Sequence, residues 1–192
     1  MSCPKYQGLR LERHNAVVYL LQSLLERLVG KNKVRGPEVF LQEGTDHRMD
    51  LTVTIGAVEF FVDVSIVDPC CQTYVQHHHS NTVSNAAALA MANVKRRKYL
   101  PILESIGVNE PELLIPFVLE SSGRLGPNAE AFLQKLEKVP SYNGSDPMSL
   151  VHFFRRRCLI TTLSYGGALV EKGWQNEIQV HIIIIIMVSS PV

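Results

Sequence analysis

Asp50 and Asp63 are the strongest candidates in the sequence for a reactive or metal-binding role, because they stand in neighbouring strand-like segments. Residues 50–55 and 58–65 both alternate in polarity and are rich in β-branched and aromatic side chains, with Gly56-Ala57 between them. This pattern predicts a β-hairpin with a tight turn. In the register that the turn sets, Asp50 lies directly opposite Asp63.

The predicted hairpin has one wholly apolar face and one face that carries the two aspartates together with Ser65. A slip of one residue would bring Asp63 among the valines, which the two-residue period of a strand disfavours when that face is buried. The expected opposed pairs of the apolar face are Ile55 with Val58, Val53 with Phe60, Leu51 with Val62 and Met49 with Val64.

Opposed residues on one face of a hairpin have Cβ atoms roughly 4.5–5.5 Å apart, and like charges so placed repel. One carboxylate then takes up a proton, or a divalent cation bridges the two, and hard oxygen ligands suit Mg²⁺ or Mn²⁺. The alternative is a solvated hairpin end, in which each aspartate merely ends a strand or pairs with a cation such as Arg48. Glu43, just before the hairpin, is a candidate third carboxylate for a metal.

Two compact basic clusters, residues 95–98 and 155–157, are candidates for contacts to phosphate, although such runs more commonly form a solvated helix face. A net charge of +1 gives no global attraction to nucleic acid or to acidic membranes. Cys70 and Cys71 near the histidines 77–79 suggest zinc only weakly, since consecutive histidines cannot all converge on one ion. No phosphate-binding glycine loop of the G-x-x-x-x-G-K type occurs in the sequence.

The composition, 46% hydrophobic and 19% charged over 192 residues, is typical of a globular protein that buries a core. The four cysteines show no paired spacing typical of a secreted disulfide framework, and the N-terminus has no apolar signal region, so we expect an intracellular protein with reduced thiols. The isoleucine run at 182–186 is too short to span a bilayer, so no membrane association is expected.

The expected elements are a helix, three strands, a helix, a strand and further helices. A polar loop is expected over 70–82, a break of the second long helix near Pro101, an edge position or a bulge for the strand that contains Pro116, and interruption of the last helical segment by glycines. We divide the chain at residue 138 into a core, 1–138, and a C-terminal helical appendage with a hydrophobic tail, 139–192. The expected ranges are helices 12–29, 83–106, 126–138 and 148–162 and strands 37–42, 50–55, 58–65 and 113–119.

This order over residues 12–120, with an Asp at the start of the second strand and another near the end of the third, resembles the PD-(D/E)XK restriction-endonuclease-like fold. The resemblance implies an α/β domain with an αβββαβ core, whose mixed sheet is flanked by helices. Shorter segments also resemble the C-terminal region of reverse-transcriptase proteins of non-LTR retrotransposons. These segments are residues 13–18, 48–51, 62–69, 95–99, 115–126 and 155–169.

The resemblance implies that Asp50 and Asp63 hold Mg²⁺ or Mn²⁺ and that a lysine assists the attacking water. Ser65 stands where the family motif has that lysine, so the family's alternative of a lysine on the following helix would fall to Lys95 or Lys98. Arginines of the two basic clusters would hold the DNA backbone, namely Arg96, Arg97, Arg155, Arg156 and Arg157.

The implied function is that of a metal-dependent DNA endonuclease domain of retroelement origin, found here without a reverse-transcriptase domain and consistent with action in the nucleus. Two other interpretations stay open. One is a catalytically inactive relative that binds nucleic acid or a protein, which the missing motif lysine favours. The other is a helix-rich scaffold with no nucleic-acid role.

Overall fold

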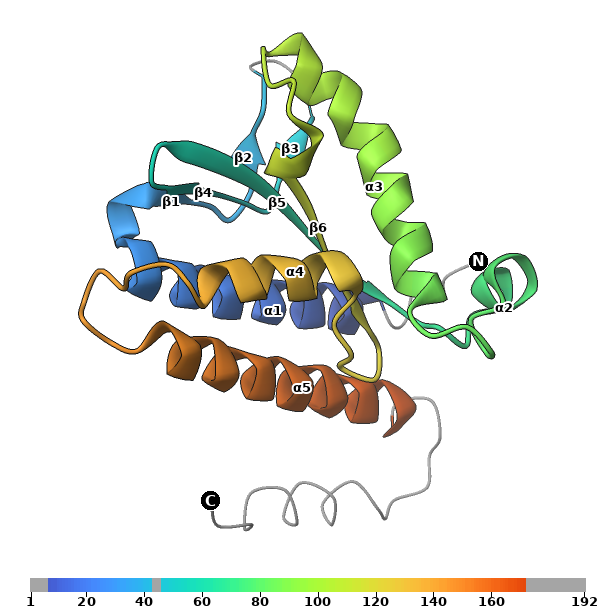
Figure 1. Ribbon diagram of the computed structural model, residues 1–192. Coiled ribbons are helices and arrows are strands. Elements are labelled where there is room, and N and C mark those ends of the chain that lie inside the picture. The colour runs from blue at the N-terminus through green and yellow to red at the C-terminus, as the bar shows by residue number, and fades with distance from the viewer. Residues whose placement is uncertain (1–6, 43–45, 172–192) are drawn as a thin grey trace, which may run out of the picture.

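The protein is a mixed α/β structure built on a four-stranded sheet of order β1-β4-β5-β6, with helices on both faces (Figure 1). The computed structural model describes residues 7–42 and 46–171. The three strands β1, β4 and β5 pair antiparallel, and β6 pairs parallel to β5. A separate two-stranded ribbon is formed by β2 and β3. The strands are β1 (Val34–Arg35), β2 (Val39–Phe40), β3 (Arg48–Met49), β4 (Leu51–Ile55), β5 (Val58–Val67) and β6 (Leu114–Glu120).

The predicted hairpin is confirmed as β4 and β5, with Leu51 opposite Val62 and Ile55 opposite Val58. The predicted pairing of Met49 with Val64 is wrong. Met49 belongs to β3, where it pairs with Val39. It packs on the face of the sheet opposite to Leu51, so the chain bends at the residue between them, Asp50.

The bend at Asp50 is held by a close approach of the chain segment that precedes β2. The Asp50 carbonyl accepts a hydrogen bond from the Glu38 amide at 3.1 Å. Gly36 has a φ of +145°, and a Cβ there would lie 2.7 Å from the Asp50 carbonyl oxygen and 2.5 Å from a methyl group of Leu51. Because only glycine leaves room for this contact, the sequence Gly36-Pro37-Glu38 helps to fix the start of β4.

The helices divide between the two faces of the sheet. The first face is covered by α1 and α4, and α5 packs against α1 (Figure 1). The opposite face is covered by α3, which leads from β5 towards the parallel strand β6. The helices are α1 (Gln7–Val29), α2 (Gln72–His78), α3 (Ala86–Ser105), α4 (Pro127–Leu136) and α5 (Pro147–Glu171), with 3₁₀ turns η2 (Lys31–Lys33) and η3 (Pro111–Leu113).

The larger core lies between the sheet and the helices α1, α4 and α5. Val17, Leu21 and Leu28 repeat at helical spacing on α1 and are fully buried against the sheet and its neighbours. Phe154 of α5 contacts Phe117 of β6 edge to face, with ring centroids 6.0 Å apart. Hence α5 contributes to the same core as α1 and β6. The division of the chain at residue 138 stays a prediction.

Four expectations about the elements are wrong or incomplete. The region 70–82 is not a loop throughout, because α2 forms within it. The long helix α3 continues through Pro101, although proline removes one backbone hydrogen bond of the helix. The helix stays continuous because Tyr99 and Leu103, on either side of Pro101, are buried against the sheet. The helical segment after residue 147 continues through Gly166 and Gly167 as one helix, α5, whereas Gly173 lies outside the described residues. The strand β1 was not predicted.

The edge position expected for the strand with Pro116 is confirmed, because β6 ends the four-stranded sheet formed by the described residues and β5 is its one neighbouring strand there, apart from an isolated bridge between Leu119 and Leu125. Proline is tolerated there because its missing N–H can face the unpaired side of the strand. None of the helices in the described part of the chain is both long and apolar enough to cross a bilayer.

Candidate active site at the open edge of β5

The strand β5 extends beyond its partner β4, and this leaves an open edge at Val64. The last pair of the β4–β5 ladder is Leu51 with Val62. Beyond it, the Val64 amide donates to the Asp50 carboxylate at 2.6 Å. The Val64 carbonyl lies 3.2 Å from Nε2 of His14, which projects from α1. A carboxylate and an imidazole therefore satisfy the backbone groups that a longer β4 would have paired.

His14 also contacts Asp50 directly, with Nε2 3.4 Å from Oδ2 of the carboxylate. This hydrogen bond is the main cause that raises the pKa of His14 to about 9, and partial burial opposes the shift. The imidazole is therefore protonated near neutral pH and offers Nε2–H to two oxygen atoms, one of Asp50 and one of Val64. Neither of the outcomes first considered for Asp50, a solvated strand end or a pair with Arg48, is observed. Arg48 pairs with Glu38 and Asp46 instead.

Asp63 lies in the middle of β5 beneath α3, and its side chain is only 6% exposed. Lys95 Nζ lies 2.8 Å from its Oδ2. The Ser65 hydroxyl is 3.5 Å from the same oxygen, and the Tyr99 hydroxyl also donates to this carboxylate. Burial raises the pKa of Asp63, Lys95 opposes that shift, and the negative charge of Asp50 adds to it. The two aspartates are therefore close enough for the charge of Asp50 to raise the pKa of Asp63.

Lys95 and Tyr99 reach Asp63 together because residues four apart lie on the same face of a helix. Burial and then the Asp63 charge raise the pKa of Tyr99, so its hydroxyl stays a donor. Lys98 points elsewhere. It is exposed, and its amine donates to the Tyr99 hydroxyl at 3.0 Å instead of contacting an aspartate. Of the two lysines considered from the sequence, Lys95 contacts the Asp63 carboxylate directly. Lys98 contacts the Tyr99 hydroxyl, which in turn contacts Asp63.

The oxygen atoms at this edge have the chemistry that a hard divalent cation requires. A carboxylate oxygen of Asp50 and the carbonyl oxygen of Val64 converge on one point, since both lie within 3.4 Å of His14 Nε2. That point is occupied by Nε2 of the protonated imidazole, which already balances the charge of Asp50, so a metal ion would bind these oxygens only in place of His14. The Asp63 carboxylate is nearby but is engaged by Lys95.

The structure gives no support to the other proposed metal ligands. Glu43 lies outside the described residues. Across the ranges 7–42 and 46–171, no group of three or more His, Cys, Asp or Glu side chains gathers to hold a metal. The zinc alternative meets the same finding, and Cys70 and Cys71 are exposed free thiols.

The arginines proposed to hold DNA fall into two groups. Arg155 is engaged within the fold, because it bridges Glu130 at 2.6 Å and Glu137 at 2.5 Å. Arg96 donates to the Asn128 side chain at 2.8 Å. Arg97, Arg156 and Arg157 are exposed, and are thus the members of the two clusters with room for a ligand.

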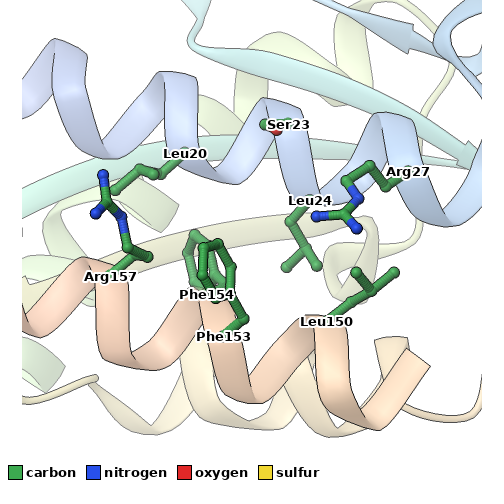
Figure 2. A pocket seen from close by; sticks show the side chains of 8 residues that line it. All are labelled: Leu20, Ser23, Leu24, Arg27, Leu150, Phe153, Phe154 and Arg157. Atoms are coloured by element: carbon green, nitrogen blue, oxygen red, sulfur yellow. The ribbon is translucent and has the colours of Figure 1, made fainter. Parts of the chain in front are cut away.

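Arg157 lines a groove between α1 and α5 (Figure 2). The groove has apolar walls that include Leu24 and Phe154, and Arg27 lines it from α1. Neither aspartate lines it. The groove is therefore separate from the carboxylate cluster at the edge of β5.

Two members of the cluster were not among the residues selected from sequence, His14 and Tyr99. Tyr99 could have been found, because its spacing of four from Lys95 places both side chains over the same strand. His14 could not, because it meets Asp50 only after α1 has packed beneath the sheet, 36 positions away along the chain.

No family model matches the sequence, and no characterised protein is significantly similar to it.

Proposed function

We propose that this protein is a PD-(D/E)XK restriction-endonuclease-like domain of retroelement origin that cleaves DNA with Mg²⁺ or Mn²⁺. The observation that carries the proposal is the contact between Lys95 Nζ and Asp63 Oδ2 at 2.8 Å. A lysine supplied by α3 thus reaches a carboxylate in the second strand of the hairpin. This supports the alternative that the resemblance implies when Ser65 stands at the motif lysine position, namely a lysine supplied by a following helix.

The topology of the sheet also supports the proposal. A helix precedes an antiparallel hairpin, and a second helix crosses to a strand parallel to its last strand. With the ribbon β2–β3 and the short helix α2 taken as additions, the elements α1, β1, β4, β5, α3 and β6 follow one another as αβββαβ, which supports the proposal. The first strand of that series is β1 of the main sheet, whereas the sequence had suggested residues 37–42.

The carboxylates of Asp50 and Asp63, with the Val64 carbonyl, would hold the metal ion. When bound, a divalent cation supplies Lewis-acid polarisation of the phosphodiester and activation of water. The Lys95 ammonium then lies beside the reacting phosphate, where it stabilises the negative charge that develops in the transition state. His14 orients Asp50 and is a positioning residue.

Nicking of supercoiled plasmid in Mg²⁺ or Mn²⁺ tests the proposal. We expect activity in the wild type and its loss in Asp63→Asn and Lys95→Met. Lys98→Met is the matched control, because Lys98 lies on the same helix, carries the same charge and touches neither aspartate. If Lys98→Met and Lys95→Met are equally active, the lysine does not act as proposed.

A second candidate is an inactive relative that binds DNA without cutting it. It is favoured by the observation that each carboxylate already has a cationic partner, Asp50 with His14 and Asp63 with Lys95. In this case the wild type binds DNA but produces no nicks above the Asp63→Asn background in either metal. Absence of both binding and nicking would contradict both candidates and leave a scaffold.

A further inference from the structure

Arg13 is a buried cation without the partners that a buried cation normally has. Arg13 is 8% exposed, and its Nε atom has no hydrogen-bond partner within the described parts of the chain. Buried polar atoms are almost always hydrogen-bonded, and an uncompensated buried charge is strongly destabilising. Burial of Arg13 therefore has a cost that no hydrogen bond to its Nε atom from the described residues offsets.

The charges around Arg13 do not remove this cost. Arg10 lies three residues earlier on α1, on the same side of the helix, and its positive charge acts against that of Arg13. Asp68 attracts Arg13, but less strongly than Arg10 repels it. The Asp68 carboxylate also accepts from the Cys70 amide at 3.0 Å and the Ser121 hydroxyl at 3.4 Å. The carboxylate that attracts Arg13 is thus already engaged by two other hydrogen-bond donors.

Arg13 adjoins the candidate active site through the chain itself. The next residue, His14, reaches Asp50 and Val64 at the open edge of β5. Consecutive residues of a helix point about 100° apart, so the two side chains leave α1 in different directions from adjacent Cα atoms. An anion held by Arg13 would therefore bind at α1 one residue from His14 and on a different side of the helix.

We propose that Arg13, assisted by Arg10, binds a phosphate group of the DNA backbone next to the cleavage site. The planar guanidinium offers parallel N–H donors that match two phosphate oxygens, and an anion between two arginines compensates both charges. The identity of the phosphate as DNA rests on the proposed function. The binding of a phosphate oxyanion rests only on the unpartnered buried guanidinium.

The variant Arg13→Met separates a ligand-binding role from a structural one, because the two roles predict opposite changes in stability. Replacing an uncompensated buried charge by an apolar side chain of similar length should leave the metal-free protein as stable as the wild type or more so. Binding of DNA should weaken about tenfold to hundredfold, as expected for a lost charged hydrogen bond. A structural arginine would instead lower the unfolding midpoint on substitution.

Binding is measured by fluorescence anisotropy of a labelled DNA duplex in EDTA, so that cleavage plays no part. The slope of log K against log salt should fall by about one in Arg13→Met. Arg13→Lys keeps the charge but not the planar fork, so we expect an intermediate affinity. Arg27→Met is the matched control, because it removes an exposed arginine from the same helix, and we expect an unchanged affinity.

A second arm uses inorganic phosphate as the probe, against chloride at equal ionic strength. Phosphate should raise the urea midpoint of the wild type and not that of Arg13→Met. An equal rise in both proteins overturns the site, as does loss of stability in Arg13→Met with unchanged DNA binding. A phosphate effect specific to Arg13 together with unchanged DNA affinity overturns DNA as the source.

The outcome is independent of whether the protein cuts DNA. Asp63→Asn tests the nuclease proposal by nicking, whereas its DNA affinity in EDTA should still depend on Arg13. If the wild type fails to nick but Arg13→Met binds DNA less tightly, the phosphate site stands and the nuclease proposal fails. If nicking occurs and Arg13→Met binds DNA as the wild type does, the reverse holds.

Discussion

Removing Lys95 should expose how much the protein depends on this one ion pair. In Lys95→Met the Asp63 carboxylate, whose side chain is only 6% exposed, loses its cation at 2.8 Å. Breaking a buried pair by removing one partner typically costs about 3–5 kcal/mol. The cost has a ceiling, because Asp63 can take up a proton instead of remaining charged.

The ceiling follows from the ordinary carboxyl pKa of 3.8. Protonating such a group at pH 7 costs about 4 kcal/mol. The hydroxyls of Ser65 and Tyr99 remain near Asp63 and reduce the loss somewhat. We therefore expect the free energy of unfolding of Lys95→Met at pH 7 to be about 3 kcal/mol below that of the wild type.

The same reasoning gives a dependence on pH. Burial already raises the pKa of Asp63, and loss of Lys95 raises it further. Above pH 3.8 the folded variant then binds a proton that the unfolded chain does not, so its stability falls as pH rises. The difference of about 3 kcal/mol from the wild type should shrink by up to about 1.4 kcal/mol for each unit that the pH is lowered from 7, and should be nearly gone by about pH 5.

Urea unfolding followed by circular dichroism at pH 5, 6 and 7, in EDTA, measures this difference. Asp63→Asn combined with Lys95→Met is the control, because it has no carboxyl to titrate and should lack the added pH dependence. A loss below about 1 kcal/mol at pH 7 with no pH dependence would match an exposed ion pair. That result would refute the buried contact and, with it, the proposed role of Lys95.

Three further predictions concern other parts of the fold. Asp50 raises the pKa of His14 to about 9. The stabilisation of the fold by the His14–Asp50 pair should therefore be complete below pH 6.5 and lost as pH rises through 9. The gap to His14→Gln, up to about 3 kcal/mol in EDTA, should close accordingly, and a constant gap in urea unfolding would contradict this. Arg155→Ala should lose about 1–2 kcal/mol through its two glutamate partners, whereas exposed Arg156→Ala should stay within about 0.5 kcal/mol; equal thermal midpoints for the two variants would count against the bridge. Burial raises the pKa of Cys158 to about 12, so a thiol reagent followed by mass spectrometry should modify exposed Cys70 first, and equal rates would show that α5 is not packed as described.

Much of the fold follows from local patterns in the sequence. The apolar repeat of α1 and the hairpin register about Gly56-Ala57 depend on residues close in the chain, and both were predicted correctly. The edge position of β6 follows from the backbone chemistry of Pro116 alone. The region 70–82 was misjudged because its polar composition resembles a loop.

Local patterns failed where a distant segment decided the outcome. The hairpin pattern extended to Met49, but the approach of Gly36 and the hydrogen bond from Glu38 bend the chain at Asp50. Pro101 would break an isolated helix, whereas the burial of neighbouring side chains keeps α3 continuous. In each case tertiary packing outweighs a local preference of a few kcal/mol.

Local patterns in the sequence were enough to place Asp50 beside one strand and Asp63 in the next, with a basic helical segment later in the chain. Which cations contact these two acids depends instead on how distant segments pack. Lys95 rather than Lys98 faces Asp63 because of the rotation at which α3 packs on the sheet, and His14 faces Asp50 because α1 crosses beneath β5. Ion pairing acts over a few ångströms, and separations of this size between segments far apart in sequence are fixed only by the packing of the whole core.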